Sequence, residues 1–137
     1  MSIDAFVFLR DENLPTVQQW QAALDQADTG ITLDSIDDLS GHSGYFPVKH
    51  RSHDSGFEWY YGPLAENFGG TPPEGLGGRG HVVNFVLHSD MRELACAMIS
   101  GAVLADIADG LVLDEETGSL IGGLQALTAA RLIENDV

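Results

Sequence analysis

The segment spanning residues 90–109 constrains the fold more than any other part of the chain, because apolar residues surround a helix built from it on nearly every side. A helix of this kind is buried within a domain rather than laid on its surface. Small residues recur at four-residue spacing (Ala97, Gly101 and Ala105), which lets such a helix approach a sheet closely. The sequence therefore predicts one long, central, buried helix.

Two amphipathic helices are predicted beside this central one. The first begins within residues 13–16, where Asn13 or Thr16 can cap its free N–H groups, and ends at Gly30, since glycine suits the end of a helix. The second covers residues 122–133, where apolar residues recur at helical spacing. Ser89 or Asp90 is expected to cap the long helix.

Short apolar runs and alternating patterns predict strands between these helices. The predicted strands are 3–9, 31–33, 57–61, 81–88, 111–113 and 119–121. Successive strands pair antiparallel when helices are segregated to one face, which is the α+β arrangement. A Gly- and Pro-rich segment at about 62–80 is expected to be a mobile loop. With no internal repeat, the chain is interpreted as a single α+β domain over residues 1–137, mainly an antiparallel sheet with the long buried helix and two flanking helices.

Charge restricts the partners of this domain. Twenty-one acidic residues against six basic ones give a net charge of -15, yet 44% of residues are hydrophobic, so the acids decorate a folded surface. Such a field repels nucleic acid and anionic membranes and accelerates encounter with cationic proteins. No apolar run approaches the ~20 residues of a membrane span, the N-terminal residues do not resemble a secretory signal, and Cys96 is the only cysteine. We therefore expect a cytoplasmic protein whose partner is a basic protein.

A histidine-containing segment offers the main alternative. His42, His50 and His53 lie close in sequence, with Asp54 and Glu58 following them, and imidazole and carboxylate are ligands that zinc accepts. A small metal-binding protein or hydrolase using this segment is thus the rival hypothesis. Its ligand spacing is irregular, so loop histidines that are simply solvated remain the competing interpretation.

The run Gly-Leu-Gly-Gly-Arg-Gly at 75–80 has the spacing of a dinucleotide-binding loop. Such a loop must connect a strand to the beginning of a helix, where N–H groups bind the pyrophosphate. Here it follows a Pro-rich segment and leads into a predicted strand. We expect a plain loop, and no cofactor.

The aromatic segment 57–61 is the basis for predicting where a partner protein binds. Alternation places Phe57 and Trp59 in the core and leaves Tyr60 beside Glu58 on the opposite face. Exposed tyrosines are frequent anchors in protein interfaces, and nearby carboxylates would attract a basic partner. The expected partner-binding residues are Asp34, Asp37, Asp38, Asp54, Glu58 and Tyr60.

Several segments, including Gly-Tyr-Phe-Pro-Val at 44–48 and Ser-Gly-Phe-Glu-Trp-Tyr at 55–60, resemble those of small uncharacterised bacterial proteins, some of them similar to immunity proteins of toxin systems. The similar segments also include 14–23 and 105–114. The resemblance implies a small binding protein and no catalytic residue. The leading hypothesis is a non-catalytic acidic protein-binding domain, an immunity protein that neutralises a basic toxin such as a nuclease. A homo-oligomer whose aromatic side chains fill a self-interface is a further alternative.

Overall fold

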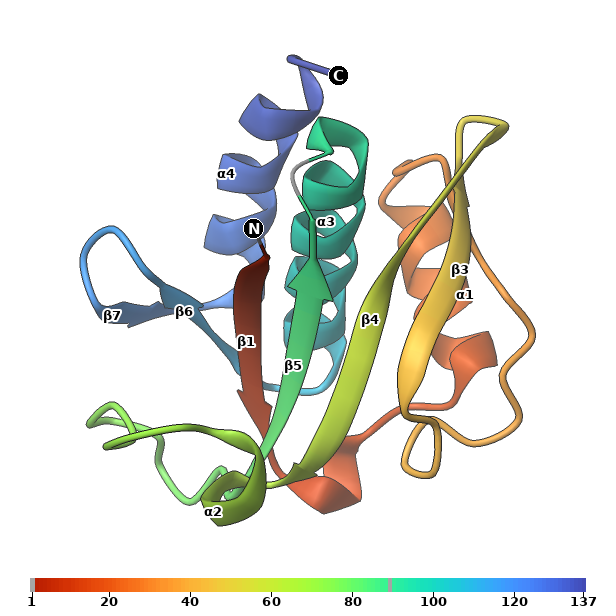
Figure 1. Ribbon diagram of the computed structural model, residues 1–137. Coiled ribbons are helices and arrows are strands. Elements are labelled where there is room, and N and C mark those ends of the chain that lie inside the picture. The colour runs from red at the N-terminus through yellow and green to blue at the C-terminus, as the bar shows by residue number, and fades with distance from the viewer. Residues whose placement is uncertain (1, 89) are drawn as a thin grey trace.

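A computed structural model describes residues 2–88 and 90–137. Within these residues seven strands form one antiparallel sheet, in the spatial order β2-β3-β4-β5-β1-β6-β7 (Figure 1). The strands are β1 Ile3–Leu9, β2 Ile31–Leu33, β3 Gly44–His50, β4 His53–Pro63, β5 His81–Leu87, β6 Leu111–Asp114 and β7 Ser119–Ile121. The helices are α1 Val17–Gln26, α2 Leu64–Asn67, α3 Met91–Ile107 and α4 Gly123–Glu134, with a 3-10 turn at Asp11–Asn13.

Helices α1, α3 and α4 lie together on one side of the sheet, with α3 between the other two (Figure 1). Helix α3 packs directly on the central strands β1, β4 and β5, and α4 packs against α3. The predicted α+β fold, its long buried helix and its two flanking helices are confirmed.

Gly101 explains how α3 comes so close to the sheet. A Cβ at this position would lie 3.2 Å from the Phe85 ring and 3.4 Å from Val7, which is tighter than ordinary contact. Trp20 of α1 is fully buried beside α3, and its indole N–H donates to the Ser100 carbonyl at 3.1 Å. Gly101, one of the small residues at four-residue spacing, therefore allows the close packing of α3 on the sheet.

Side-chain caps fix where the helices begin. Thr16 accepts a hydrogen bond from the Gln19 N–H at 3.1 Å, and the Gln19 side chain accepts one from the Thr16 N–H at 2.9 Å. This reciprocal cap satisfies two N–H groups that a helix start leaves free. Asp90 caps α3 by accepting from the Arg92 N–H at 2.8 Å, while the alternative cap, Ser89, lies outside the described residues.

Two segments differ from the sequence predictions. Strand β3 was not predicted, because Gly44 and Pro47 are atypical of strands, yet its alternate residues face the core. The first two residues of the expected loop at 62–80 end strand β4, and the short helix α2 follows them. Phe68 packs edge-on against Phe6 and Phe8, with ring centroids 4.9 and 5.5 Å apart. This part of the segment covers one end of the sheet face opposite the helices (Figure 1).

Helix α1 contacts β2 through one polar side chain. The Gln21 amide N–H donates to the Ile31 carbonyl at 2.9 Å, and the Gln21 carbonyl oxygen accepts from the Leu33 N–H at 2.6 Å. One side chain thereby bonds to the backbone of β2 as a neighbouring strand would. These two hydrogen bonds fix β2 against α1.

Candidate functional site

We call the side of the sheet away from α1, α3 and α4 the open face. Tyr45 of β3 lies on it and is 57% exposed, although it is a large aromatic residue. Its hydroxyl donates to the Ser55 carbonyl at 3.1 Å, and its ring lies on the backbone of Gly56. A Cβ at Gly56 would come within 2.8 Å of ring carbon Cε1, and closer still to the hydroxyl. Tyr45 is therefore held in one orientation with its outer surface in solvent.

A shallow hollow lies on each side of Tyr45. One is lined by Asp34, Lys49 and Asp54, and the other by Glu58, His88 and Glu93. Burial raises the pKa of the Tyr45 hydroxyl, and the nearby charges of Glu93 and Asp54 raise it further. The tyrosine thus stays uncharged between two carboxylate-bearing hollows.

Both carboxylate oxygens of Glu58 have a side-chain partner, which fixes the orientation of this group. The Tyr60 hydroxyl donates to one of its oxygens, and His88 Nε2 lies 3.3 Å from the other. The hydrogen bond to Glu58 is the main reason that the pKa of Tyr60 is raised. A carboxylate fixed in this way can accept a hydrogen bond from a cationic side chain with little loss of side-chain entropy.

The structure brings only part of the predicted contact set together. Asp34, Asp54 and Glu58 line the hollows beside Tyr45, and Tyr60 orients Glu58. Asp37 and Asp38 lie in the segment that precedes β3. Asp38 accepts from the hydroxyl of Ser40 at 2.6 Å and from its N–H at 3.0 Å, and these bonds lower the pKa of that carboxyl.

The three histidines of the rival hypothesis have separate partners. His42 Nε2 lies 2.9 Å from the Tyr45 carbonyl, and its ring packs on Phe46. His53 bonds locally to the Arg51 carbonyl at 3.3 Å, whereas His50 is buried. Across residues 2–88 and 90–137, no group of three or more His, Cys, Asp or Glu side chains is placed to hold a metal ion.

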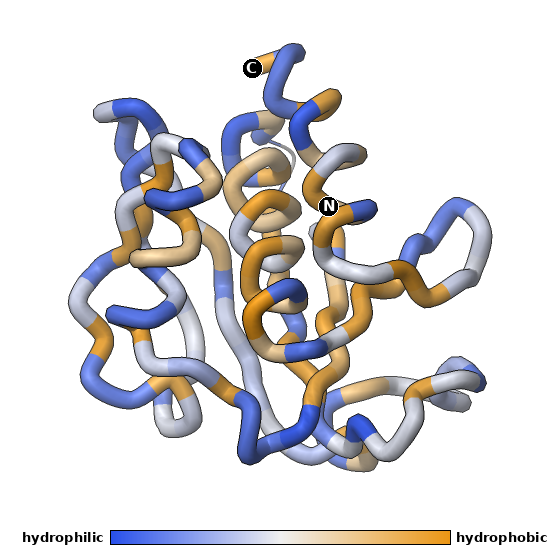
Figure 2. Tube along the Cα trace, turned by 180° about the vertical axis from the view of Figure 1, so that it is seen from behind, coloured by the Kyte–Doolittle hydropathy of each residue, from blue (hydrophilic) through white to orange (hydrophobic). Residues whose placement is uncertain are grey.

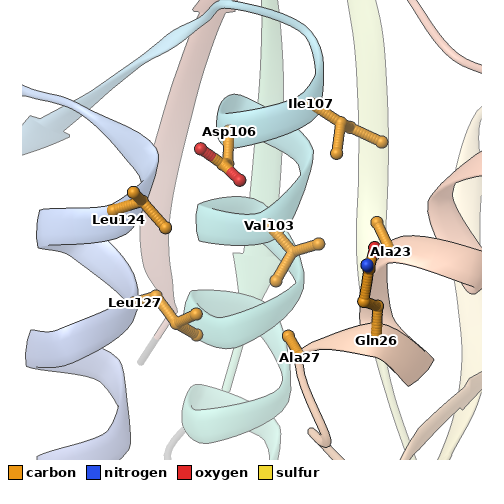
Figure 3. A pocket seen from close by; sticks show the side chains of 8 residues that line it. All are labelled: Ala23, Gln26, Ala27, Val103, Asp106, Ile107, Leu124 and Leu127. Atoms are coloured by element: carbon orange, nitrogen blue, oxygen red, sulfur yellow. The ribbon is translucent and has the colours of Figure 1, made fainter.

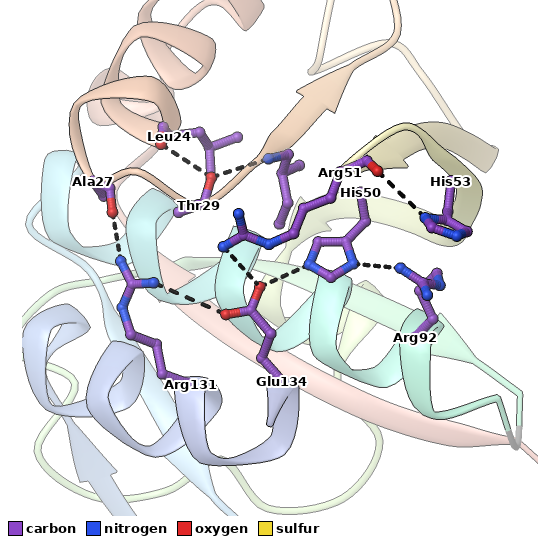
Figure 4. Close-up of polar contacts among 10 residues, drawn as sticks. Leu24, Ala27, Thr29, His50, Arg51, His53, Arg92, Arg131 and Glu134 are labelled. Carbon is purple, nitrogen blue, oxygen red and sulfur yellow. Dashed lines mark hydrogen bonds and ion pairs between the residues drawn. The ribbon is translucent and has the colours of Figure 1, made fainter. Parts of the chain in front are cut away.

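His50 is instead the buried member of a polar cluster that the sequence does not reveal (Figure 4). Its Nε2 is 2.7 Å from Glu134 of α4, and its Nδ1 is 2.8 Å from the guanidinium of Arg92 of α3. An arginine can only donate hydrogen bonds, so Nδ1 of His50 is the acceptor from Arg92. The ring proton is therefore on Nε2, which donates a hydrogen bond to the Glu134 carboxylate. His50 and Glu134 lie far apart in the sequence, so no spacing pattern could have predicted that they are paired.

Two further arginines complete the cluster. Arg51 lies 3.7 Å and Arg131 lies 4.0 Å from Glu134, and Arg131 also donates to the Ala27 carbonyl at the end of α1. Half of the six basic residues are therefore used to join the ends of elements. The basic residue beside Tyr45 is Lys49, which does not belong to this cluster. Its ammonium group lies 3.9 Å from the exposed Asp54 carboxylate.

Comparisons with protein-family models, with curated proteins and with solved structures gave no match to this chain. Among the residues that the structure describes, none forms a helix long and apolar enough to cross a membrane.

Proposed function

We propose that the chain is a non-catalytic acidic protein-binding domain that takes a basic protein on its open face, centred on Tyr45. The observation that carries this proposal is the fixed, 57% exposed Tyr45 ring between two carboxylate-lined hollows. Tyrosine is enriched among the residues that dominate interface energies, because it offers a large contact area with few rotatable bonds.

The charge of the chain supports a cationic partner. With a net charge of -15, long-range attraction would speed encounter, and the partner's Lys or Arg side chains would then enter the hollows on either side of Tyr45. Asp34 and Asp54 would receive them on one side, and Glu58 on the other. Of the carboxylates expected from sequence to contact a partner, this proposal keeps Asp34, Asp54 and Glu58, and it adds Tyr45 as the anchor.

The partner class we propose is a basic bacterial toxin such as a nuclease, which would make this chain an immunity protein. A nuclease binds the phosphate backbone through a positively charged cleft. An acidic surface with an aromatic anchor is complementary to such a cleft and would compete with nucleic acid for it.

The test is affinity capture from the source cell with wild-type protein, Tyr45→Ala and Leu132→Ala in parallel. Leu132 is a matched control, because it is 67% exposed but belongs to α4 on the other side of the sheet. We expect a basic protein retained by wild type and Leu132→Ala and lost by Tyr45→Ala, with an affinity about tenfold or more weaker for the tyrosine variant.

The captured protein is then purified and its association rate measured between about 50 and 500 mM salt. Electrostatic steering predicts a rate that falls about tenfold or more over this range. An acidic captured protein, equal retention by Tyr45→Ala, or a salt-independent association rate contradicts the proposal. Inhibition of nuclease activity by stoichiometric chain separates the toxin assignment from the wider binding role.

A further inference from the structure

The layer of helices carries an apolar groove, on the side of the molecule away from the open face (Figure 3). Ala23 of α1 and Ala27, the residue that follows α1, form one wall, and Leu124 and Leu127 of α4 form the other. The floor is Val103 and Ile107 of α3. In Figure 2, apolar colours run along much of the central helix at this place.

The groove exists because α1 presents small side chains towards α4. Ala23 and Ala27 leave the end of α3 partly uncovered, so that Ile107 is 41% exposed. On the opposite wall, Leu124 of α4 is 67% exposed. Contiguous exposed apolar surface of this kind marks interaction sites in folded proteins. In a chain this rich in acids, charged side chains could have filled these positions.

The two ends of the groove differ. At one end Arg131 of α4 donates to the carbonyl of Ala27, directly after α1, and this hydrogen bond bridges the two walls. At the other end the surface passes Ile107 into a second hollow, lined by Glu12, Leu14 and Pro15. The groove is thus closed at one end and continues along α1 at the other.

Charge identifies the kind of occupant. Within the described part of the chain, the ionisable residues that line these two hollows are Asp106 and Glu12, both acidic. A second copy of the chain would bring its own acids against them and add another net charge of -15. A segment with an apolar face and basic edges is complementary to both the surface and its rim.

We propose that this groove binds an amphipathic α-helix of a partner protein, with an apolar face seated on Ile107, Leu124 and Leu127 and with Lys or Arg at the edge facing Asp106. Helix-in-groove binding fits because α1 and α4 are spaced by one intervening helix, α3, which supplies an apolar floor. The proposal is independent of the open face and its partner.

The test uses the full chain, labelled with ¹⁵N, and two synthetic helical peptides of about 14 residues, which span about 21 Å. One peptide is built of Leu and Lys, and the other has the same pattern with Glu in place of Lys. We expect the Leu/Lys peptide to shift backbone signals of α1, α3 and α4 around the groove. The Leu/Glu peptide is expected to bind at least about tenfold more weakly.

Two variants on the same helix localise the binding. Leu124 and Leu132 are each 67% exposed, but only Leu124 lines the groove. Leu124→Gln is expected to weaken the Leu/Lys peptide about fivefold or more, and Leu132→Gln to leave its affinity within about twofold. Asp106→Asn is expected to reduce the dependence of binding on salt.

Four results would overturn the proposal. These are the absence of groove shifts at millimolar peptide, equal effects of the two leucine variants, shifts confined to residues around Tyr45, and self-association of the chain that protects the groove. Because Tyr45→Ala leaves the groove intact, peptide binding by that variant separates this site from the open face. A variant that loses both sites has lost its fold, which its NMR spectrum shows directly.

Discussion

The ring of Tyr45 lies on the backbone of Gly56 in the neighbouring strand, and the Tyr45 hydroxyl donates to the carbonyl of Ser55, one residue before that glycine. The missing side chain of Gly56 makes room for the ring. An exposed aromatic residue thereby gains a fixed position without being buried. Such prior ordering reduces the entropy lost when a partner binds.

Gly56→Ala is expected to displace Tyr45 and destabilise the protein by about 1 kcal/mol, because the ring and its hydrogen bond are lost. The strand backbone at this position suits alanine, so the collision with the ring is the dominant effect. Urea unfolding of the single variants and of Gly56→Ala with Tyr45→Ala measures the coupling. In the Tyr45→Ala background the glycine substitution should be neutral or slightly stabilising. An equal cost in both backgrounds would refute the proposed contact.

Glu134→Ala is expected to lower the free energy of unfolding by about 2–3 kcal/mol. It removes the acceptor of the buried His50 N–H and leaves nearby arginines without their carboxylate. Chemical denaturation measures the loss. Glu116→Ala, in the exposed turn between β6 and β7, is the matched control and should change stability by less than about 0.5 kcal/mol. Similar values for both variants would show that the cluster contributes little.

Phe68→Ala is expected to cost about 2 kcal/mol, because a half-buried aromatic side chain loses its edge-on contacts with Phe6 and Phe8. The segment that follows α2 should then be cut faster by proteases. Thr71→Ala, an exposed position in the same segment, is the control and should be cut at the wild-type rate. Unchanged proteolysis of Phe68→Ala would mean that other contacts hold this segment.

Burial raises the pKa of the Cys96 thiol from 9.0 to about 11. Below the lower value the thiol is protonated in both states, and it adds no dependence on pH. Between the two values the unfolded chain loses this proton while the folded chain keeps it, so the free energy of unfolding falls as pH rises. Relative to Cys96→Ala, the wild type should lose about 2 kcal/mol over this interval, measured by urea unfolding at several pH values. A constant difference between the two proteins would contradict the expected shift.

The layered fold could be predicted because its signals are local. The all-round apolar pattern of 90–109 predicts a buried helix, and the alternation in 81–88 predicts a strand with one face on that helix. Strand β3 could not be predicted, because Pro47 and Gly44 are atypical of strands. Its residues Phe46 and Val48 are nevertheless buried. Tertiary packing there outweighs the propensities of single residues.

The site was harder to predict because its members meet only through pairing of distant segments. The acids Asp54 and Glu58 could be chosen from charge, but the role of Tyr45 depends on a cross-strand glycine. His50 was grouped with His42 and His53 because they are near in sequence. Its actual partners come from α3 and from the last helix, and no spacing within the chain signals them.

The two hydrogen bonds between Gln21 and β2 have a consequence for how this protein can associate. β2 is an outermost strand of the sheet, and the Ile31 carbonyl and the Leu33 N–H are groups that another strand would use to attach. The Gln21 side chain is hydrogen-bonded to both of these backbone groups, so they are not free to pair with another strand. Growth of the sheet by strand addition, whether by a partner or by further copies in an aggregate, is blocked at β2. At this end of the sheet a partner must therefore be recognised by side chains rather than by backbone pairing, whereas β7 forms the opposite edge of the sheet.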